Sequence, residues 1–346
     1  MKQSKVILLS AVSCLLATVA AAQSTFTNPL LPSGPDPWNI YVDGYYYYTN
    51  TLGNRVDIWK TKDLSQLKTA ERKTIWTPPP NTMYSKQLWA PEIHHLNGKW
   101  YAYFAADDGN NDHHRMYVLE NSSSDPMTGT WNFKGKVADQ DDKWAIDGSV
   151  FEHHGKLYFI WSGWEGDKNG RQDIYIAEME NPWTIRGRRV RISKPELDWE
   201  RHGDLNNPND PPHVDVNEGP QFLKHGKNVF IVYSASACWT DFYALGMLQA
   251  DKSADLLDPS SWKKSEKPVF NQSTANGVFA PGHNSFFKSP DGQEDWILYH
   301  ANDESGQGCG NKRSPRAQKF TWMNDLPVFG EPLKAGVPLP APSKAP

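Results

Sequence analysis

The stretch Gly34-Pro35-Asp36-Pro37-Trp38 decides the fold of this chain, because it runs at once into the aromatic pattern Tyr45-Tyr46-Tyr47-Tyr48. Gly, Pro and Asp favour turns, and a run of aromatic residues favours a strand. Four further segments follow the same plan. They are Ala90-Pro91-Glu92 before Trp100 to Phe104, Asp147-Gly148-Ser149 before Leu157 to Trp161, Asn217-Glu218-Gly219-Pro220 before Val229 to Tyr233, and Gly282-His283-Asn284 before Trp296 to His300.

The leads of these five segments recur at a similar spacing. They fall at positions 36, 92, 147, 218 and 283, which gives steps of 56, 55, 71 and 65 residues. Short alternating runs separated by turn residues follow each aromatic strand and predict about three to four antiparallel strands per unit. A repeat of this size made of strands predicts an all-β fold, a five-bladed β-propeller in a single domain. Radial blades would bring the same position of every repeat to one central axis.

The sequence divides into three parts along its length. Residues 1–22 form a predicted secretory signal peptide, and residues 23–335 carry the repeats. No linker interrupts the repeats, so we expect one propeller domain. Residues 336–346 form a Pro- and Ala-rich tail, which we expect to be disordered or to begin a linker.

The signal peptide is predicted from the order of its residue types. Lys2 and Lys5 give a basic start, a mostly apolar run extends from Val6 to Val19, and Ala20-Ala21-Ala22 offers a small-residue cleavage site. The apolar run is too short for a transmembrane helix. We therefore expect a secreted protein, either extracellular or, in a Gram-negative bacterium, periplasmic.

The composition bears on the partners of the protein. The chain of 346 residues has a formal net charge of −4 and no basic stripe, so we expect no nucleic-acid partner. No later stretch is long and apolar enough to span a membrane, so we expect no membrane partner. The 15 Trp and 14 Tyr residues can serve as stacking platforms for sugars or can fill strand cores and blade interfaces.

Two cysteines remain after the signal peptide, Cys238 and Cys309. Two cysteines in an exported chain favour one disulfide. They lie 71 residues apart in neighbouring repeats, so a bridge would tie two blades together. Two separate buried thiols are the alternative.

A long polar insertion, Lys194 to Val216, leads directly into the fourth repeat. Long loops on a rigid scaffold tend to carry function. Because the insertion ends just before Glu218, we expect it to form one wall of a pocket.

Asp36, Asp147 and Glu218 are the candidate catalytic residues, because each begins a repeat where the inner strands should converge. A glycosidase needs one carboxylic acid to protonate the leaving oxygen and one carboxylate to activate water. Glu218 suits the acid, because its longer side chain can reach the glycosidic oxygen. A nearby ionised Asp147 would raise the pKa of Glu218 by repulsion between like charges. Asp36, held between two prolines, suits the base; the alternative is that all three are ordinary turn residues.

Two further side chains have more than one interpretation. His283 occupies the lead position of the fifth repeat. It can bind a metal in the central channel, directly or through water, can hydrogen-bond a carboxylate, or can be a core residue. Arg316 begins a strand beside the glycine-rich stretch 306–310, where it can donate to substrate hydroxyls or to a catalytic carboxylate, or lie on the surface.

Taken together, these motifs resemble glycoside hydrolase family 43, a family of exported five-bladed propeller enzymes that invert the anomeric configuration. The resemblance spans roughly residues 28–330. It rests on an ordered set of motifs: Gly34-Pro35-Asp36-Pro37, Trp89-Ala90-Pro91-Glu92, Ile146-Asp147-Gly148-Ser149 and Asn217-Glu218-Gly219-Pro220.

The resemblance implies a role for each candidate residue. Asp36 would be the general base, Glu218 the general acid, and Asp147 the residue that orients the acid and raises its pKa. His283 matches a channel histidine that lies near a calcium or other ion, which would be structural, since the chemistry requires no cofactor. Trp89 matches a pocket-lining ring that binds substrate, and Arg316 matches a substrate-contacting arginine.

Within the family, the chain is most similar to the α-L-arabinofuranosidase branch, on the stretch Ser234 to Trp239 and the loop that contains Cys309. This resemblance implies an exo-acting enzyme that removes terminal arabinofuranose from plant cell-wall arabinan or arabinoxylan. A β-xylosidase or β-galactofuranosidase on the same scaffold is an alternative. A non-catalytic carbohydrate-binding propeller is an alternative from another class.

Overall fold

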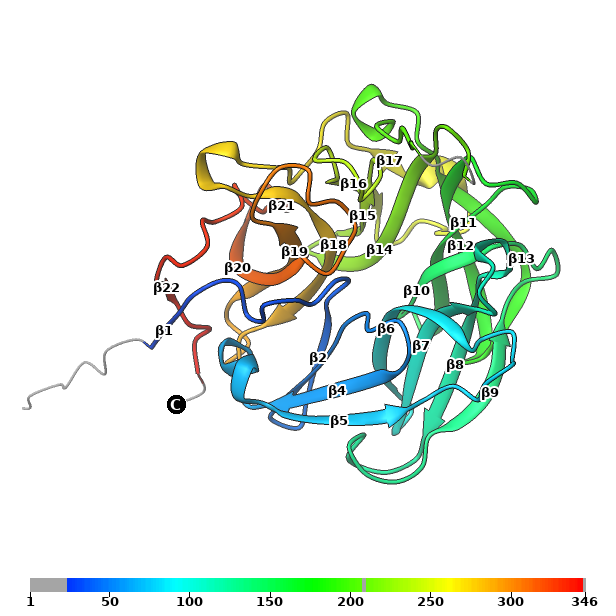
Figure 1. Cartoon of the computed structure of the whole chain (residues 1–346), viewed down its shortest axis with the longest axis horizontal. Coiled ribbons are helices and arrows are strands. Elements are labelled where there is room, and N and C mark those ends of the chain that lie inside the picture. Colours follow the sequence, from blue (N-terminus) through cyan, green and yellow to red (C-terminus); the bar gives the residue numbers. More distant parts are fainter. Residues whose placement is uncertain (1–23, 207–209, 345–346) are drawn as a thin grey trace, which may run out of the picture.

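Five consecutive groups of four strands form the body of the molecule in this computed structural model, which describes residues 24–206 and 210–344 (Figure 1). Blade 1 contains β2 (Trp38–Val42), β3 (Tyr45–Thr49), β4 (Val56–Thr61) and β5 (Glu71–Trp76). Blade 2 contains β6 (Lys86–Leu96), β7 (Lys99–Asp107), β8 (Arg115–Asn121) and β9 (Asn132–Val137). Blade 3 contains β10 (Ala145–His153), β11 (Lys156–Gly163), β12 (Arg171–Asn181) and β13 (Thr184–Ser193). Blade 4 contains β14 (Asp215–His225), β15 (Asn228–Ala235), β16 (Ala244–Asp251) and β17 (Lys263–Lys264), and blade 5 contains β18 (Phe279–Lys288), β19 (Asp295–Asn302), β20 (Ser314–Met323) and β21 (Leu326–Val328).

The first strands of the five blades close into a ring. Within each blade, neighbouring strands pair antiparallel in sequence order. Between blades, β2 contacts β6, β6 contacts β10, β10 contacts β14, β14 contacts β18, and β18 returns to β2. This arrangement confirms the predicted all-β propeller, and it places the starts of the five inner strands around one channel.

Alternation along the aromatic strands explains why blades pack on both faces. In β3, Tyr46 and Tyr48 are buried in a cluster with residues of blade 5, whereas Tyr47 lies between them in sequence and is buried in a cluster with blade 2. Successive side chains of a strand point to opposite faces. A strand that is apolar at every position is therefore buried between two neighbours, which is why these strands show no polar face.

The inner strands of blades 2 to 5 are interrupted by a bulge at the same place. In these four blades, three residues of the first strand span two residues of the second, as between Ile146 and Ser149 or between Glu218 and Gln221. The residue that begins the bulge has a positive φ, namely Ala90, Asp147, Gly219 and His283, and Asp36, which lies just before β2 in blade 1, has a positive φ as well. Bulges redirect side chains next to active sites, and positive φ outside glycine is strained and clusters at such sites.

The bulges correct the expected alignment of the repeats. Asp36, Asp147 and His283 do share one repeat position, but Glu218 lies one residue before it and Glu92 two residues after it. Residue type alone suggests that Glu218 and Glu92 are equivalent to the aspartates, but the register of the strands shows that they are not. Glu218 therefore projects from the pleat differently from the two aspartates.

The two ends of the described chain meet on the edge of the ring. Strand β1 (Thr25–Phe26) pairs antiparallel with β22 (Leu339–Pro340), and Ala341 is buried. The expectation of a disordered tail is therefore wrong for residues 336–344, because Leu339 packs on the same apolar cluster as Phe26. The predicted signal peptide, residues 1–22, lies outside the described residues.

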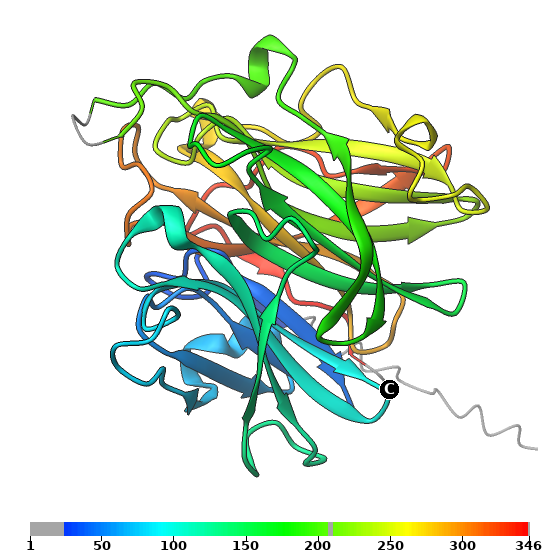
Figure 2. The same cartoon turned by 90° about the vertical axis from the view of Figure 1, so that its right-hand side faces the viewer.

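Among the residues that the structure describes, helical structure is confined to five short 3₁₀ segments in connections. They are η1 (Leu64–Thr69), η2 (Asn111–His113), η3 (Asp198–Glu200), η4 (Pro259–Ser261) and η5 (Thr274–Asn276). No helix within the described ranges is long and apolar enough to cross a membrane. The connection that contains η3 runs along one edge of the molecule in the side view (Figure 2).

Candidate active site

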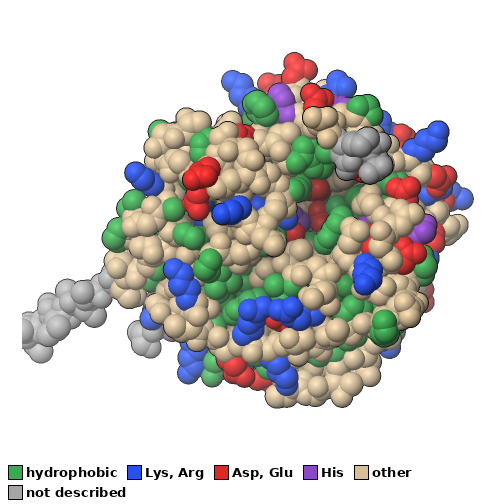
Figure 3. Space-filling view, in the orientation of Figure 1, with side chains coloured by type: hydrophobic (Ala, Val, Ile, Leu, Met, Phe, Trp, Pro, Cys, Tyr) green, Lys and Arg blue, Asp and Glu red, His purple; other side chains and the backbone are tan. Residues whose placement is uncertain are grey.

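A cavity of about 400 Å³ opens at the end of the ring where the inner strands begin. It is lined by Asp36, Asp147, Glu218 and His283, together with residues from every blade. Acidic side chains are visible at the bottom of a recess near the middle of the face in Figure 3. The convergence predicted from the repeats is therefore what the fold produces.

Asp36 is held as an anion. Its Oδ1 accepts a hydrogen bond from Arg313 Nη1 at 2.8 Å, and its Oδ2 accepts one from the Thr51 hydroxyl at 2.6 Å. Its backbone N–H donates to Nδ1 of His300 at 3.0 Å. Burial would raise the pKa of Asp36, but Arg313, the two nearby imidazoles and the Thr51 hydroxyl outweigh burial and hold that pKa well below its usual range. A buried carboxylate that stays ionised is suited to accept a proton from water.

Glu218 is held as a proton donor. Burial and the negative charge of Asp36 raise the pKa of Glu218 to about 7, against the opposing effects of the Tyr243 hydroxyl and of Arg313. The Tyr243 hydroxyl donates to Glu218 Oε1 at 2.8 Å, and Tyr243 is itself fully buried. A carboxylic acid with a pKa near neutrality is a matched general acid. The two carboxyl groups thus have opposite protonation states.

Asp147 contacts the segment that carries the acid. Its Oδ2 accepts the backbone N–H of Gly219, the residue after Glu218, at 3.0 Å. Burial and the charges of Glu218 and Asp36 raise the pKa of Asp147 well above its usual range. Burial is the largest cause of the raised pKa of Glu218, and the charge of Asp36 adds to it. Asp147 is placed to orient the acid.

Two glycines make this packing possible. Gly219 has a φ of +55°, and a Cβ there would lie 3.3 Å from Nδ1 of His283. A Cβ on Gly282 would lie 2.2 Å from Cε1 of Tyr243, which is far inside contact distance. The ring of Tyr243 can reach Glu218 only because residue 282 has no side chain.

His283 faces the same carboxylates. Its Nδ1 lies 3.3 Å from Asp36 Oδ1, and burial lowers its pKa, which favours the neutral imidazole. Potential ligand atoms of His283, Asp147 and Glu218 all lie within 4.8 Å of one another. Two carboxylates and an imidazole fit a divalent cation. However, a cation bound directly to Glu218 would lower its pKa and remove its proton, so this donor set does not fit an ion during acid catalysis.

Two tryptophans form one wall of the cavity. Trp89 stacks on His114 with ring centroids 4.0 Å apart, and Nδ1 of His114 lies 3.0 Å from Oδ2 of Asp107. Trp144 also lines the cavity and stacks on Trp164 at 4.8 Å. Trp89 is partly exposed, so its ring, fixed from behind by His114, presents a flat apolar face on which a sugar can stack, whereas Trp144 is nearly fully buried.

Residues 26–327 match the family described as glycosyl hydrolases family 43. The chain belongs to this family. It is 41% identical over 331 residues to an extracellular exo-α-(1→5)-L-arabinofuranosidase of Streptomyces avermitilis, with 93% of this chain and 66% of that enzyme aligned. It is 38% identical to the enzyme of the same name from Streptomyces chartreusis, over 83% of this chain and 85% of that one. The crystal structure of an α-L-arabinofuranosidase from Lactobacillus brevis superposes with a TM-score of 0.82 and 39% identity, covering 90% of this chain and 98% of that chain.

Membership of family 43 makes this chain a glycoside hydrolase.

The polar insertion Lys194 to Val216 forms one wall of the cavity, as predicted. Leu205, Asp210 and Val214 line the cavity. The insertion is anchored by Glu200, which is fully buried and accepts hydrogen bonds from Asn217 Nδ2, the Tyr233 hydroxyl and Lys264 Nζ. Asn217 precedes Glu218, so the insertion and the acid share one support.

Arg316 does not lie where the sequence placed it. It is fully buried and donates to Asp303 at 2.6 Å, and it is not among the residues that line the cavity. Arg313 lines the cavity instead. Arg313 immediately precedes β20, and Tyr243 immediately precedes β16, so both lie where the third strand of a blade begins. In an antiparallel blade that end is also where the inner strand begins, which is a signal that could have identified both residues.

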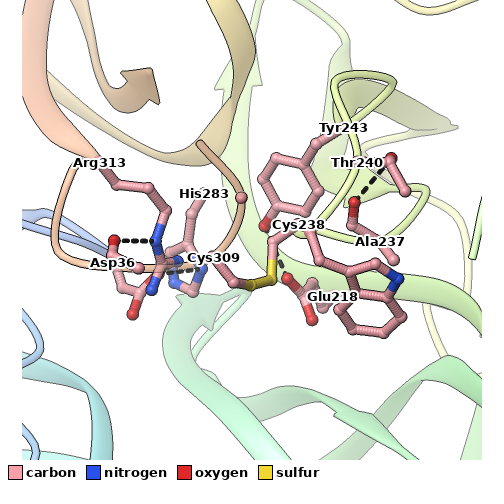
Figure 4. The surroundings of a disulfide bond; sticks show 12 residues. Asp36, Glu218, Ala237, Cys238, Thr240, Tyr243, His283, Cys309 and Arg313 are labelled. Atoms are coloured by element: carbon pink, nitrogen blue, oxygen red, sulfur yellow. Dashed lines mark hydrogen bonds and ion pairs between the residues drawn. A yellow bond between two sulfur atoms is a disulfide. The ribbon is translucent and has the colours of Figure 1, made fainter. Parts of the chain in front are cut away.

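The Cys238–Cys309 disulfide is present, as predicted, and joins blades 4 and 5 with a Cα–Cα distance of 5.1 Å. Both cysteines line the cavity beside Asp36, Glu218 and Arg313 (Figure 4). The sequence indicated the bridge but not its place in the active site.

A second depression, of about 590 Å³, lies on the side of blade 3 and is lined by Glu165 and Arg191 among others. Arg191 Nη1 contacts Glu165 Oε1 at 2.7 Å, and this hydrogen bond and charge lower the pKa of Glu165. Glu165 is therefore held as an anion by its arginine partners and does not resemble the raised acid Glu218.

Proposed function

We propose that this protein is an exo-acting α-L-arabinofuranosidase that hydrolyses by single displacement with inversion. The observation that carries the proposal is the pair in one cavity, with Asp36 held ionised and Glu218 held protonated. Inverting glycosidases need such a pair, one carboxylate to activate water and one acid to protonate the leaving oxygen. The names of the relatives at 41% and 38% identity support arabinofuranose as the sugar and exo as the mode of action.

In this mechanism Asp36 takes a proton from the water that attacks the anomeric carbon. Arg313 and Thr51 hold one oxygen of Asp36 each, which fixes the direction of the carboxylate. Glu218 gives its proton to the glycosidic oxygen as the bond to the leaving sugar breaks. The negative charge then left on Glu218 is stabilised by the Tyr243 hydroxyl.

The other candidate residues position these groups or the sugar. Asp147 holds the backbone beside Glu218 and so orients the acid. Trp89 contacts a sugar face, backed by the buried His114. We place the arginine that contacts the reacting end at Arg313 rather than Arg316, because only Arg313 lines the cavity.

The chemistry needs no cofactor in this proposal, because proton transfer by two carboxyl groups is sufficient. A calcium or other ion in the central channel, held next to His283 through water, would be structural. A chelator should then lower the melting temperature while leaving the rate of hydrolysis of the folded enzyme unchanged. Loss of hydrolysis at constant melting temperature would contradict this part of the proposal.

The natural substrate in this proposal is plant cell-wall arabinan or arabinoxylan, met outside the cell. The two Streptomyces relatives carry the word extracellular in their names, which supports secretion. Mass analysis of the secreted chain should find residues 1–22 removed.

The test is the sugar released from arabinan, arabinoxylan, xylo-oligosaccharides and galactofuranosides. We expect free arabinose alone, and loss of nearly all activity in Asp36→Asn and Glu218→Gln with circular dichroism unchanged. Release of xylose or galactose would reassign the enzyme as a β-xylosidase or β-galactofuranosidase. Binding of an oligosaccharide without turnover would indicate a non-catalytic carbohydrate-binding propeller.

A further inference from the structure

Two connections meet at the mouth of the cavity. One joins β15 to β16 in blade 4 and contains Cys238, and the other joins β19 to β20 in blade 5 and contains Cys309. The disulfide joins them directly, and both of its cysteines face the cavity (Figure 4). This covalent bond between blades thus lies within the substrate pocket.

The connection in blade 5, residues 303–313, has little packing of its own. Its residues from Asp303 to Gly306 and from Gly310 to Lys312 are exposed. Three glycines in the stretch 306–310 add backbone freedom. Segments with few buried apolar contacts open at low free-energy cost unless they are tied down.

Two ties hold this connection to blade 4. The first is the disulfide. The second is Asp241, whose carboxylate accepts hydrogen bonds from the Ser305 hydroxyl and, at 2.9 Å, from the backbone N–H of Gly306. Asp241 is partly solvent-accessible, and hydrogen bonds at exposed positions compete with water. The disulfide is therefore the stronger of the two ties.

The connection ends at the arginine that contacts the base. Arg313 follows Cys309 by four residues and donates to Asp36 Oδ1 at 2.8 Å. Its Nε donates to the carbonyl of Gly310, the residue after Cys309, at 3.3 Å. The carbonyl of Arg313 is held by the backbone N–H of Gly34 at 3.0 Å, so movement of Cys309 would reach the guanidinium through the carbonyl of Gly310.

We propose that the Cys238–Cys309 disulfide is a positioning element of the active site, which keeps Arg313 on Asp36 by holding residues 303–313 against blade 4. The inference rests on the proposed function in that it takes Asp36 to be the base. It makes hydrolysis dependent on the oxidised state of one bond. Dithiothreitol would reduce this bond to two thiols and would itself be oxidised to its cyclic disulfide, in a transfer of two electrons and two protons.

The chain allows a clean reductive test. It has three cysteines, and the third, Cys14, lies in the predicted signal peptide, so reduction of the mature enzyme changes one bond. We expect dithiothreitol to lower kcat by about tenfold to 100-fold, because a misplacement of about 1 Å in catalytic geometry has effects of that order. We expect KM to change much less. The double variant Cys238→Ser, Cys309→Ser should have the low kcat without any reductant, and dithiothreitol should not change that kcat.

A double-mutant cycle separates positioning from a general loss of structure. If the disulfide acts through Arg313, its removal should cost little further kcat in an Arg313→Met background. The same fold-loss of kcat in both backgrounds would overturn the inference. So would full kcat in wild-type enzyme whose two thiols have been titrated as free, a measurement that does not need the variants to fold.

The outcome for the proposed function is read separately, on the oxidised wild-type enzyme. Failure of that enzyme to release arabinose overturns the proposed function and this inference with it. Release of arabinose that is indifferent to reduction leaves the proposed function standing and overturns only the role of the disulfide.

Discussion

The change Tyr243→Phe tests how the acid is tuned. It removes the hydroxyl that donates to Glu218 Oε1 at 2.8 Å and keeps the ring that fills the space above Gly282. The hydroxyl stabilises the ionised form of Glu218, so its loss raises the pKa of Glu218 further from the value of about 7. A hydrogen bond to a charged group is worth about 1.5–3 kcal/mol. At 1.36 kcal/mol per pKa unit, this corresponds to a rise of about 1 to 2 units.

The sign of the effect on activity follows from the role of the group. A general acid works while it is protonated, so hydrolysis is lost as the pH rises through the pKa of Glu218. The alkaline limb of kcat/KM, which reports the free enzyme, should therefore move about 1 to 2 units towards higher pH in Tyr243→Phe. The assay is arabinose release from an arabino-oligosaccharide, measured across the alkaline range.

Tyr299→Phe is the matched control for this experiment. Tyr299 is also fully buried, and its hydroxyl donates at 3.0 Å to the neutral side chain of Gln318. Its alkaline limb should coincide with that of the wild-type enzyme. An unmoved limb in Tyr243→Phe, or an equal shift in both variants, would refute the assignment of Glu218 as the acid tuned by Tyr243.

Three further variants test other parts of the site. Arg313→Met should raise the pKa of Asp36 towards its usual range, so the acid limb of kcat/KM should move to higher pH; an unchanged acid limb would show that Asp36 is not the base. Gly282→Ala should displace the ring of Tyr243 and lower the free energy of unfolding, measured in urea, by about 1–3 kcal/mol. A free energy of unfolding equal to that of the wild-type enzyme would show that the ring can move aside without cost. Trp89→Ala should raise KM more than it lowers kcat, because a stacking face binds ground and transition states alike; a loss in kcat alone would place Trp89 with the reacting groups.

The sequence was sufficient to predict the propeller, because each blade repeats one local plan of turn cluster and buried aromatic strand. It was also sufficient for the convergence of Asp36, Asp147 and Glu218, because the starts of the inner strands must meet at the axis. The exact register was not predictable from residue types. The bulge places Glu218 one residue before the position shared by the two aspartates, and only the strand pairing shows this.

The residues that tune the carboxylates were missed because they come from connections. Thr51 follows β3, Tyr243 precedes β16 and Arg313 precedes β20, so their sequence neighbours carry no catalytic pattern. Their contacts with the site depend on how whole blades are placed around the channel. The order of the C-terminal tail was not predictable for a related reason. Its composition is rich in Pro, and the few apolar residues that pack in the cluster of Phe26 do not form a recognisable strand pattern.

The most direct test of the central claim is the configuration of the sugar at the moment of release. Proton NMR of early hydrolysis of an α-L-arabinofuranoside by the oxidised enzyme should show β-arabinose first, with the α anomer growing in by mutarotation. This is the outcome of a single displacement by water activated by Asp36 and assisted by Glu218. Initial release of α-arabinose would mean a retaining reaction through a covalent intermediate, and would contradict the roles given to both residues.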